Sequence, residues 1–439
     1  MSSSAAFPAR AKTVFSRLAP FLGGQLGVQG INFLAGFLLL RWLAVADYAQ
    51  FSIVFSFQTL FGSLIDLGLS GAIVALAGRN AARREVVGAY VRAASELRAR
   101  TFWILVGAAA LSWAFVTRHQ AWSTPTKMVL FASVAAAVYF QGWATIYSAP
   151  LVLDGRLKAV YSAATGAALT RLAACFLLHR AGILNGALLS WIGALALGWN
   201  GWKYRHAARG LIEEPPHSSP ETRRELGIYL QPQVPTLLFY ALQGQLAIVL
   251  VTVFGSTRAL AEVAALGRLS QLFLLLETAN AVLVAPLISR AADADFPRRY
   301  TQILSVVVLI TGVLCFVGFA FSGPLLWVLG PKYVNLRPEV GWIVLTSCLH
   351  YVASSLWTMH SARKMVDKSS SAIYIGLTLI FQAVAVQVLD LGTTHGAVLL
   401  SVFTCAGLAA ANILIGILGW KRAAKNAAPI SSEPLIPAP

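Results

Sequence analysis

The sequence has few charged residues, and acidic residues are the scarcest. Only 12% of its 439 residues are charged, 57% are hydrophobic, and the mean hydropathy is +0.70. A soluble domain carries about 25% charged residues, so this composition excludes an ordinary soluble globular protein. Long apolar runs in such a chain predict membrane-spanning helices. The expected fold class is therefore an all-α integral membrane protein with many spans.

The sequence also lacks the signatures of common catalytic and metal sites. It holds no GxSxG, P-loop or HExxH motif and no carboxylate pair at a fixed spacing in a loop. The cysteines lie inside apolar runs without CxxC spacing, which indicates small core residues; they are Cys175, Cys315, Cys348 and Cys405. We therefore expect no enzyme activity, no cofactor and no metal site. Without a nucleotide-binding motif, transport is expected to be facilitated or ion-coupled.

Apolar runs of about 18 residues or more predict twelve transmembrane helices. The predicted spans are 21–44, 49–75, 101–117, 127–150, 160–178, 182–202, 228–254, 260–289, 300–321, 338–360, 372–389 and 396–420.

Basic residues are distributed unevenly among the connections between these spans. With a cytoplasmic N-terminus, 25 Lys and Arg residues fall on the cytoplasmic side and 7 on the other. The positive-inside rule then places both termini in the cytoplasm. This distribution also explains the net charge of +17 without nucleic acid, as a basic face toward anionic lipid headgroups. Within the connection 79–100, apolar residues at helical spacing predict an amphipathic helix on the membrane surface.

The segment 203–227 divides the predicted spans into six and six. It is rich in proline, serine and charge, as expected of a solvated linker. Gly24-Gln25-Leu26 recurs as Gly244-Gln245-Leu246, which suggests two parallel six-helix repeats. We therefore expect an N-terminal cytoplasmic segment (1–20, without a signal peptide), bundles at 21–202 and 228–420 joined by the linker, and a disordered cytoplasmic tail (421–439).

The most polar of the predicted spans, 260–289, carries Arg268 and Glu277 inside its apolar sequence. An ionisable group at membrane depth costs several kcal/mol unless it meets a cavity or a partner. The two residues are nine positions apart, about 13.5 Å along a helix and on nearly opposite faces, so we do not expect them to pair. Arg268 is suited to an anionic substrate group, and Glu277 to a proton or cation. For each, a structural ion pair or a buried hydrogen-bonded acid is the alternative.

Further polar residues in the spans complete the candidate site. Asp66 is a second candidate for ion coupling, although Gly68 and Gly71 make a helix-end turn equally plausible. Arg171 could be functional or paired. Gln25, Gln29 and Asn32 form a polar stripe, joined by Gln245, which could bind substrate or instead hold helices together. Arg41, at the outer end of its span, could bind substrate or only extend to the headgroups. Asn280 of the span 260–289 is the last candidate for substrate binding.

Three stretches resemble the MOP flippase superfamily, particularly its polysaccharide (Wzx-type) branch. They are Gly24-Gln25-Leu26 through Arg41-Trp42-Leu43; Ala46-Asp47-Tyr48-Ala49-Gln50-Phe51 followed by Asp66-Leu67-Gly68-Leu69-Ser70; and Glu262 through Gly267-Arg268-Leu269-Ser270-Gln271-Leu272, followed by Pro286-Leu287-Ile288-Ser289-Arg290. The chain departs from the family at Ala44-Val45-Ala46, where relatives have Gly-Pro, and at Gln245, near which relatives often have an acidic residue.

The resemblance implies two six-helix bundles around a cavity lined by the first, second, seventh and eighth helices. It further implies alternating-access transport of undecaprenyl-diphosphate-linked sugars across a bacterial inner membrane during surface polysaccharide synthesis, with Arg268 meeting the diphosphate. The expected partners are the bilayer, the lipid-linked oligosaccharide and polysaccharide polymerase or ligase machinery, and the expected state is a monomer.

Three other functions remain open from the sequence. A MATE-type drug or small-cation antiporter would bring Asp66 and Glu277 together without Arg268. An integral-membrane glycosyltransferase or ligase would bring His119, Lys332 and Arg337 to an outer groove. A non-transporting scaffold would pair Arg268 with Glu277, sealed from water.

Overall fold

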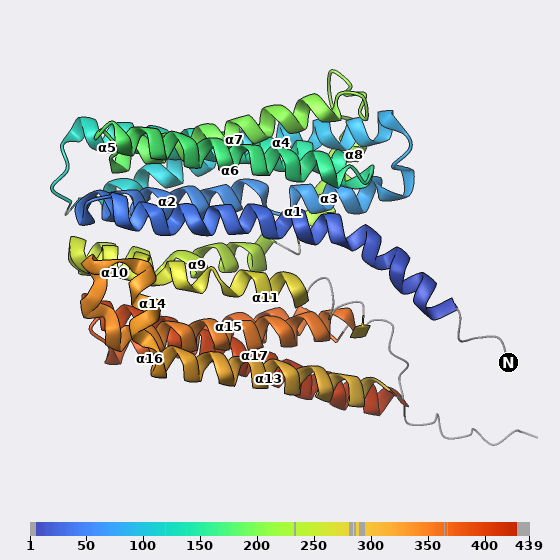
Figure 1. Ribbon diagram of the computed structural model, residues 1–439. Helices are drawn as coiled ribbons and strands as arrows, with labels where there is room; N and C mark the ends of the chain where they lie inside the picture. Colours follow the sequence, from blue (N-terminus) through green and yellow to red (C-terminus); the bar gives the residue numbers. More distant parts are fainter. Residues whose placement is uncertain are drawn as a thin grey trace, which may run out of the picture. The chain divides into compact units, whose positions relative to one another are not determined.

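The chain is helical throughout the part that the structure describes. The computed structural model describes residues 6–118, 120–231, 234–280, 284, 287–288, 295–363, 365–366 and 368–427. The helices are α1 (Ala6–Trp42), α2 (Val45–Asp66), α3 (Leu69–Ala77), α4 (Arg84–Val116), α5 (Thr124–Leu153), α6 (Leu157–Arg180), α7 (Gly186–Ala208), α8 (Pro220–Leu230), α9 (Val234–Phe254), α10 (Thr257–Ser270), α11 (Phe273–Ala279), α13 (Phe296–Ala320), α14 (Ser322–Leu329), α15 (Arg337–Ala362), α16 (Lys368–Val388) and α17 (Thr394–Ala427), with short 3-10 helices η1 (Gly78–Asn80) and η3 (Pro331–Leu336) (Figure 1).

Ten helical segments of the described residues are long and apolar enough to cross a membrane, which confirms a multi-pass all-α membrane protein. Two predicted spans differ from this set. The span 182–202 forms α7, but its tryptophans and Asn200 lower its hydropathy. The span 260–289 is not one helix: α10 ends at Ser270 and α11 begins at Phe273, with short i→i+3 hydrogen bonds across the break. Pro286 and Arg290 lie outside the described residues.

Contacts between helices divide the chain into two compact units. Unit 1 comprises Met1–Arg268 with Gly392–Thr394, and unit 2 comprises Leu269–Leu391 with His395–Pro439. The predicted boundary at 203–227 lies inside unit 1, so α9 and most of α10 pack with the first helices of the chain. The division into two six-helix bundles, and the cytoplasmic placement of both termini, stay predictions.

Unit 1 has its apolar core where α3, α4, α5 and α8 meet. Val91 and Ala94 of α4 are fully buried there, together with Leu226 of α8. This contradicts the amphipathic surface helix predicted for residues 79–100, because the apolar face of that segment packs against protein. Residues 84–116 form the single helix α4, which is 33 residues long.

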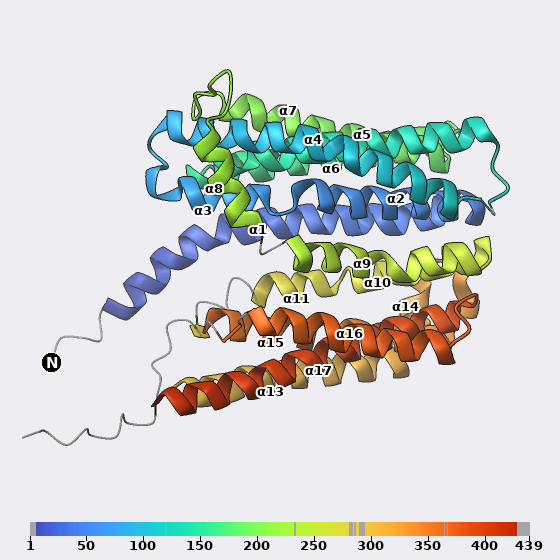
Figure 2. The ribbon, with the colours of Figure 1, turned by 180° about the vertical axis from the view of Figure 1, so that it is seen from behind.

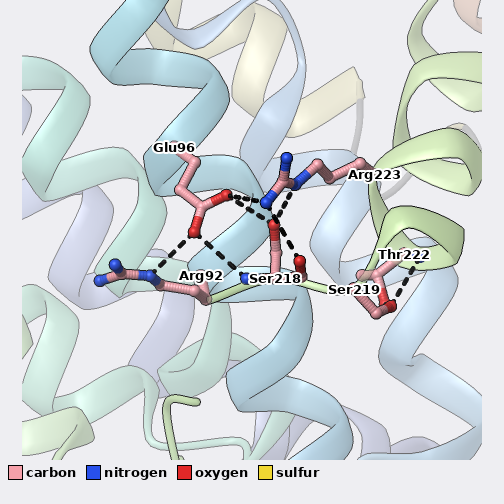
Figure 3. A network of polar contacts seen from close by, with 6 residues as sticks. All are labelled: Arg92, Glu96, Ser218, Ser219, Thr222 and Arg223. Atoms are coloured by element: carbon pink, nitrogen blue, oxygen red, sulfur yellow. Dashed lines mark hydrogen bonds and ion pairs between the residues drawn. The ribbon is translucent and has the colours of Figure 1, made fainter. Parts of the chain in front are cut away.

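The segment between α7 and α9 is folded onto unit 1, in contrast to the predicted solvated linker. Figure 2 shows α8 crossing the ends of α3 and α4, against which it packs. Glu96 of α4 accepts hydrogen bonds from the backbone and side chain of Ser218 and forms ion pairs with Arg92 and Arg223 (Figure 3). Gly88 allows this approach, because a Cβ there would lie 2.0 Å from the carbonyl oxygen of Glu213. We call this side of unit 1 its linker end.

Unit 2 is built around α15. This helix packs against α11, α13 and α14, and its buried face includes Val344, Cys348 and Tyr351. At the far end of α15, His360 is buried against Tyr300 of α13, whose hydroxyl lies 3.0 Å from His360 Nε2.

Candidate functional site

Arg268 lies in the last turn of α10, and its side chain contacts α2 and α1 within unit 1. Its Nε donates to the hydroxyl of Tyr48 at 3.2 Å, and Tyr48 donates in turn to the carbonyl of Ala264 at 3.3 Å. Tyr48 is fully buried, so this hydroxyl fixes the stem of the arginine without access to bulk water. The guanidinium carbon lies 5.2 Å from the ring centre of Phe55, a cation–π distance.

Gly36 of α1 lies directly against the side chain of Arg268. A Cβ at Gly36 would lie 3.3 Å from Cδ of Arg268 and 3.7 Å from its Nε and Nη1. A larger side chain would therefore displace the guanidinium. The Arg268 side chain lies close to the α1 backbone, and this is possible because residue 36 is a glycine and has no Cβ.

Arg171 reaches the same helix from α6. Its Nη2 donates to Oδ1 of Asn32 at 2.8 Å, while its Nε is buried without a hydrogen-bond partner. Asn32 and Gly36 are four residues apart, so Arg171 and Arg268 contact successive turns of α1. The two guanidinium groups are close enough to interact electrostatically.

We call Arg171 and Arg268 the arginine pair. Within the described part of the chain, neither forms an ion pair with a carboxylate. Two like charges at membrane depth repel each other and lack compensation, so an anion bound between them would be favoured. Guanidinium groups bind phosphate in a bidentate manner, which makes a phosphate or diphosphate the ligand that suits this arrangement best.

The rest of the predicted polar stripe lies along α1 and α9. Gln25 and Gln29 are half-buried on α1, and Asn32 joins the arginine pair. Gln245 is half-buried on α9, which packs against α2 in unit 1. The neighbouring Gln243 has a buried Oε1 without a hydrogen-bond partner in the described structure. Arg41 is exposed at the end of α1.

Glu277 has a different partner, which sequence reasoning did not identify. In unit 2, its Oε1 lies 3.3 Å from Nε2 of His350 on α15. Both side chains are partly exposed, so the pair is not sealed within the helix packing. A carboxylate facing an imidazole can exchange a proton between charged and neutral forms, which keeps Glu277 a candidate for ion coupling.

Asn280 lies one turn beyond Glu277, and its side chain is fully engaged. Its Nδ2 donates to Ser355 at 2.6 Å, and its Oδ1 accepts from Tyr351 at 3.2 Å. The residue is 2% exposed. These bonds join α11 to α15, so any contact between Asn280 and substrate would require breaking them.

Asp66 lies where α2 gives way to α3. Its carboxylate accepts from the backbone and the hydroxyl of Ser70, and thereby caps the first turn of α3. Leu67 and Gly68 adopt left-handed backbone conformations at this break. This geometry corresponds to the helix-end turn that the sequence left open beside ion coupling.

The residues of the predicted glycosyltransferase alternative do not form a described cluster. Lys332 and Arg337 are exposed in unit 2, on η3 and at the start of α15, and His119 lies outside the described residues. No group of three or more metal-ligating side chains occurs among the residues that the structure describes.

The folded chain matches solved membrane transporters over nearly its whole length. An inward-facing multidrug resistance MATE family transporter of the MOP superfamily superposes with a TM-score of 0.67 at 13% identity, covering 91% of this chain and 96% of the other. The fold is MATE-like. A eukaryotic MATE transporter matches with a TM-score of 0.60 at 13% identity (94% and 98% covered), and a MOP superfamily transporter from Pyrococcus furiosus with 0.58 at 13% (94% and 96%).

At this level of identity the MATE-like likeness concerns the fold and carries no residue correspondence. No protein-family model and no curated protein matches the sequence. The neighbours named above are transporters.

Proposed function

We propose that the chain is a flippase that moves an undecaprenyl-diphosphate-linked oligosaccharide across the bacterial inner membrane by alternating access. The observation that carries this proposal is the arginine pair. Its two guanidinium groups meet at α1 without a carboxylate among the described residues to neutralise them. A drug cation would be repelled by this site, whereas a diphosphate would relieve the repulsion between the arginines.

The surroundings of the pair are suited to an amphiphilic substrate. Phe51 and Phe55 line the guanidinium of Arg268 with aromatic surface, and Gln25, Gln29 and Asn32 supply amide groups along α1. Amides hydrogen-bond sugar hydroxyls, and aromatic faces accept apolar groups. The substrate-binding residues that we propose in unit 1 are therefore Arg268, Arg171, Gln25, Gln29 and Asn32, with Arg41 and Gln245 kept as candidates from the sequence. Asn280 of unit 2 is not among them, because its side chain is buried and bonded to Ser355 and Tyr351.

Coupling of transport to an ion is proposed for Glu277, and less directly for Asp66. Glu277 and His350 lie 3.3 Å apart within unit 2, while the carboxylate of Asp66 already accepts hydrogen bonds from Ser70 at the start of α3. The proposed setting is surface polysaccharide synthesis, in which the flippase acts as a monomer beside polymerase or ligase machinery and without nucleic acid.

A MATE-type cation antiporter is the second candidate, and the Glu277–His350 pair is the observation that favours it. A partly exposed carboxylate can hold a cation, and the MATE transporters named above share this fold. The Pyrococcus furiosus MOP superfamily transporter is described by a reverse polarity of its binding pocket that suggests a different function. By the same reasoning, the cationic pair of the present chain favours an anionic cargo.

The test is complementation of glycan export in a strain that lacks its own flippase. Wild type, Arg268→Gln and Arg171→Gln would be compared with Arg180→Gln, which removes an exposed arginine from the end of α6. Membrane levels must first be matched, because buried-charge variants can misfold. We expect wild type and the Arg180 variant to restore surface glycan and both pair variants to fail.

Two results would contradict the flippase. Restoration of glycan by both pair variants would show that the arginines are structural. Failure of wild type to restore glycan, together with altered resistance to cationic drugs, would favour the antiporter.

A further inference from the structure

Arg98 belongs to the connection 79–100, which the sequence predicts to lie on the membrane surface, and the structure buries it. It points from α4 toward α5 within unit 1 and is 9% exposed. Its stem fits against Gly142, where a Cβ would lie 2.8 Å from Cδ of Arg98. Its Nη1 is buried without a hydrogen-bond partner. A guanidinium in this state is costly unless an anion or a carbonyl completes its hydrogen bonds.

The surface beside Arg98 is a line of aromatic rings on α5. Tyr139, Trp143 and Tyr147 follow each other at four-residue intervals, with ring centres 6.4 Å apart at each step. We call these three residues the aromatic strip. Arg98 lies over Tyr139, at 5.1 Å from guanidinium carbon to ring centre, and Arg205 of α7 lies over Trp143 at 5.4 Å.

The aromatic strip lies on α5 between arginines of α4 and α7, and it is exposed at Tyr139 and buried at Tyr147. Helices α4 and α7 each pack against α5, whereas among the described residues α4 and α7 make few contacts or none with each other. Tyr139 is 43% exposed and its ring packs on Phe102 of α4 at 5.7 Å, while Trp103, the next residue of α4, is 72% exposed. At the linker end of the strip, Tyr147 is buried and its hydroxyl donates a hydrogen bond to Glu214 at 3.0 Å.

The two arginines beside the strip have no carboxylate paired with them. Among the described residues no carboxylate forms an ion pair with Arg98 or Arg205. Glu96, two residues from Arg98, is paired with Arg92 and Arg223, while Glu214 accepts a hydrogen bond from Tyr147 at the buried end of the strip and keeps its negative charge. Arg98 lies over Tyr139 and Arg205 over the next ring, Trp143, so an anion at this stretch of the strip, away from Glu214, would be attracted by two cations.

The position of Arg98 along α4 matches the depth of a lipid phosphate. Arg98 is 18 residues before the end of α4 at Val116, which is about 27 Å at 1.5 Å per residue. The hydrocarbon core of a bilayer is about 30 Å thick, and Arg118 follows the helix at the opposite boundary. Arg98 and Arg205 are therefore at the level where the headgroups of the leaflet on the linker side begin.

We propose that Arg98, Arg205 and the aromatic strip form a binding site for an anionic phospholipid in the leaflet on the linker side. The lipid phosphate completes the hydrogen bonds of Arg98, Arg205 adds a second positive charge, and an acyl chain lies against Tyr139 and Trp103. This site lies within unit 1 and involves neither residue of the arginine pair.

The experiment measures lipid binding to the purified full-length protein. Native mass spectrometry in neutral detergent would follow adducts during titration with dioleoylphosphatidylglycerol and, separately, with dioleoylphosphatidylcholine. Arg98→Gln would be compared with Arg100→Gln, which removes the same charge from an exposed position of the same helix. Losing a charge-assisted contact is expected to weaken phosphatidylglycerol binding about tenfold in the Arg98 variant and to leave the Arg100 variant near wild type.

A second variant and a second ligand test whether weaker lipid binding comes from this site. Arg205 is exposed, so the Arg205→Gln variant should fold normally. We expect this variant to bind phosphatidylglycerol at least about threefold more weakly than wild type. Equal weakening by Arg98→Gln and Arg100→Gln, or unchanged binding in Arg205→Gln, would overturn the site. Thermal stabilisation by inorganic phosphate equal to that by phosphatidylglycerol would also overturn it, because the ligand would then be a free anion.

Discussion

Removing the hydroxyl of Tyr48 is expected to weaken substrate binding while leaving the fold intact. In unit 1 this hydroxyl accepts from Arg268 Nε at 3.2 Å and donates to the carbonyl of Ala264 at 3.3 Å. Tyr48→Phe keeps the buried ring and loses both bonds. A hydrogen bond to a charged group contributes about 1.5–3 kcal/mol, equivalent to a factor of about 10 to 100 in the population of the Arg268 position.

The assay is transport of a lipid-linked oligosaccharide into proteoliposomes, with initial rates measured over a range of substrate concentrations. If Arg268 must be held by Tyr48 to bind the diphosphate, KM rises about tenfold or more in Tyr48→Phe. The matched control is Tyr204→Phe, which removes the buried hydroxyl that donates to the carbonyl of Val160 at 3.2 Å. It lies in unit 1 but does not touch the arginine pair.

The control variant is expected to lose about 1 kcal/mol of stability and to keep its KM. A wild-type KM in Tyr48→Phe, measured beside an Arg268→Gln variant that fails to transport, would refute the reasoning. Arg268 would then be positioned by something other than this hydroxyl. Equal changes in the Tyr48 and Tyr204 variants would also refute it, since they would reflect general loosening of the unit.

Two further predictions concern the linker and the second unit. Gly88→Ala should displace the backbone of Glu213, costing about 1–3 kcal/mol and exposing the linker to limited proteolysis, whereas Gly107→Ala on the same helix meets no neighbour and should not. Glu277→Gln should make transport insensitive to an imposed pH gradient while binding of substrate is kept, and His350→Gln should reproduce this effect. An unchanged gradient response in Glu277→Gln would exclude this carboxylate as the coupling group.

Most of the helices could be predicted from the sequence, because apolar length is the dominant signal in a membrane protein. Runs such as 300–321 and 396–420 correspond closely to α13 and α17. The break between α10 and α11 could not be predicted, because two polar residues, Ser270 and Gln271, are too few to end an otherwise apolar span. The burial of the segment 84–100 was also missed. An apolar helical face predicts that something covers it, and here protein covers the face in place of lipid.

The candidate site was only partly accessible from sequence. Arg268 and Glu277 stood out because ionisable groups at membrane depth are costly. Their partners did not, because Tyr48 is an ordinary aromatic residue in a helix and His350 is one of several scattered histidines. Gly36 carries no signal by itself, since its role depends on an arginine more than two hundred positions away. Long-range pairing of this kind is fixed by packing and leaves no local pattern.

The bond between Tyr48 and Arg268 also sets an order of events during synthesis. The two residues are 220 positions apart, and chains are made at roughly 5–20 residues per second. Tyr48 is therefore made about 10 to 45 s before the arginine that it binds. During that interval α1 and α2, and α6 once it has been made, must remain in the membrane with their side of the arginine pair incomplete. A nascent chain arrested before α10 would lack the guanidinium that completes the pair, and would be a natural substrate for membrane quality control.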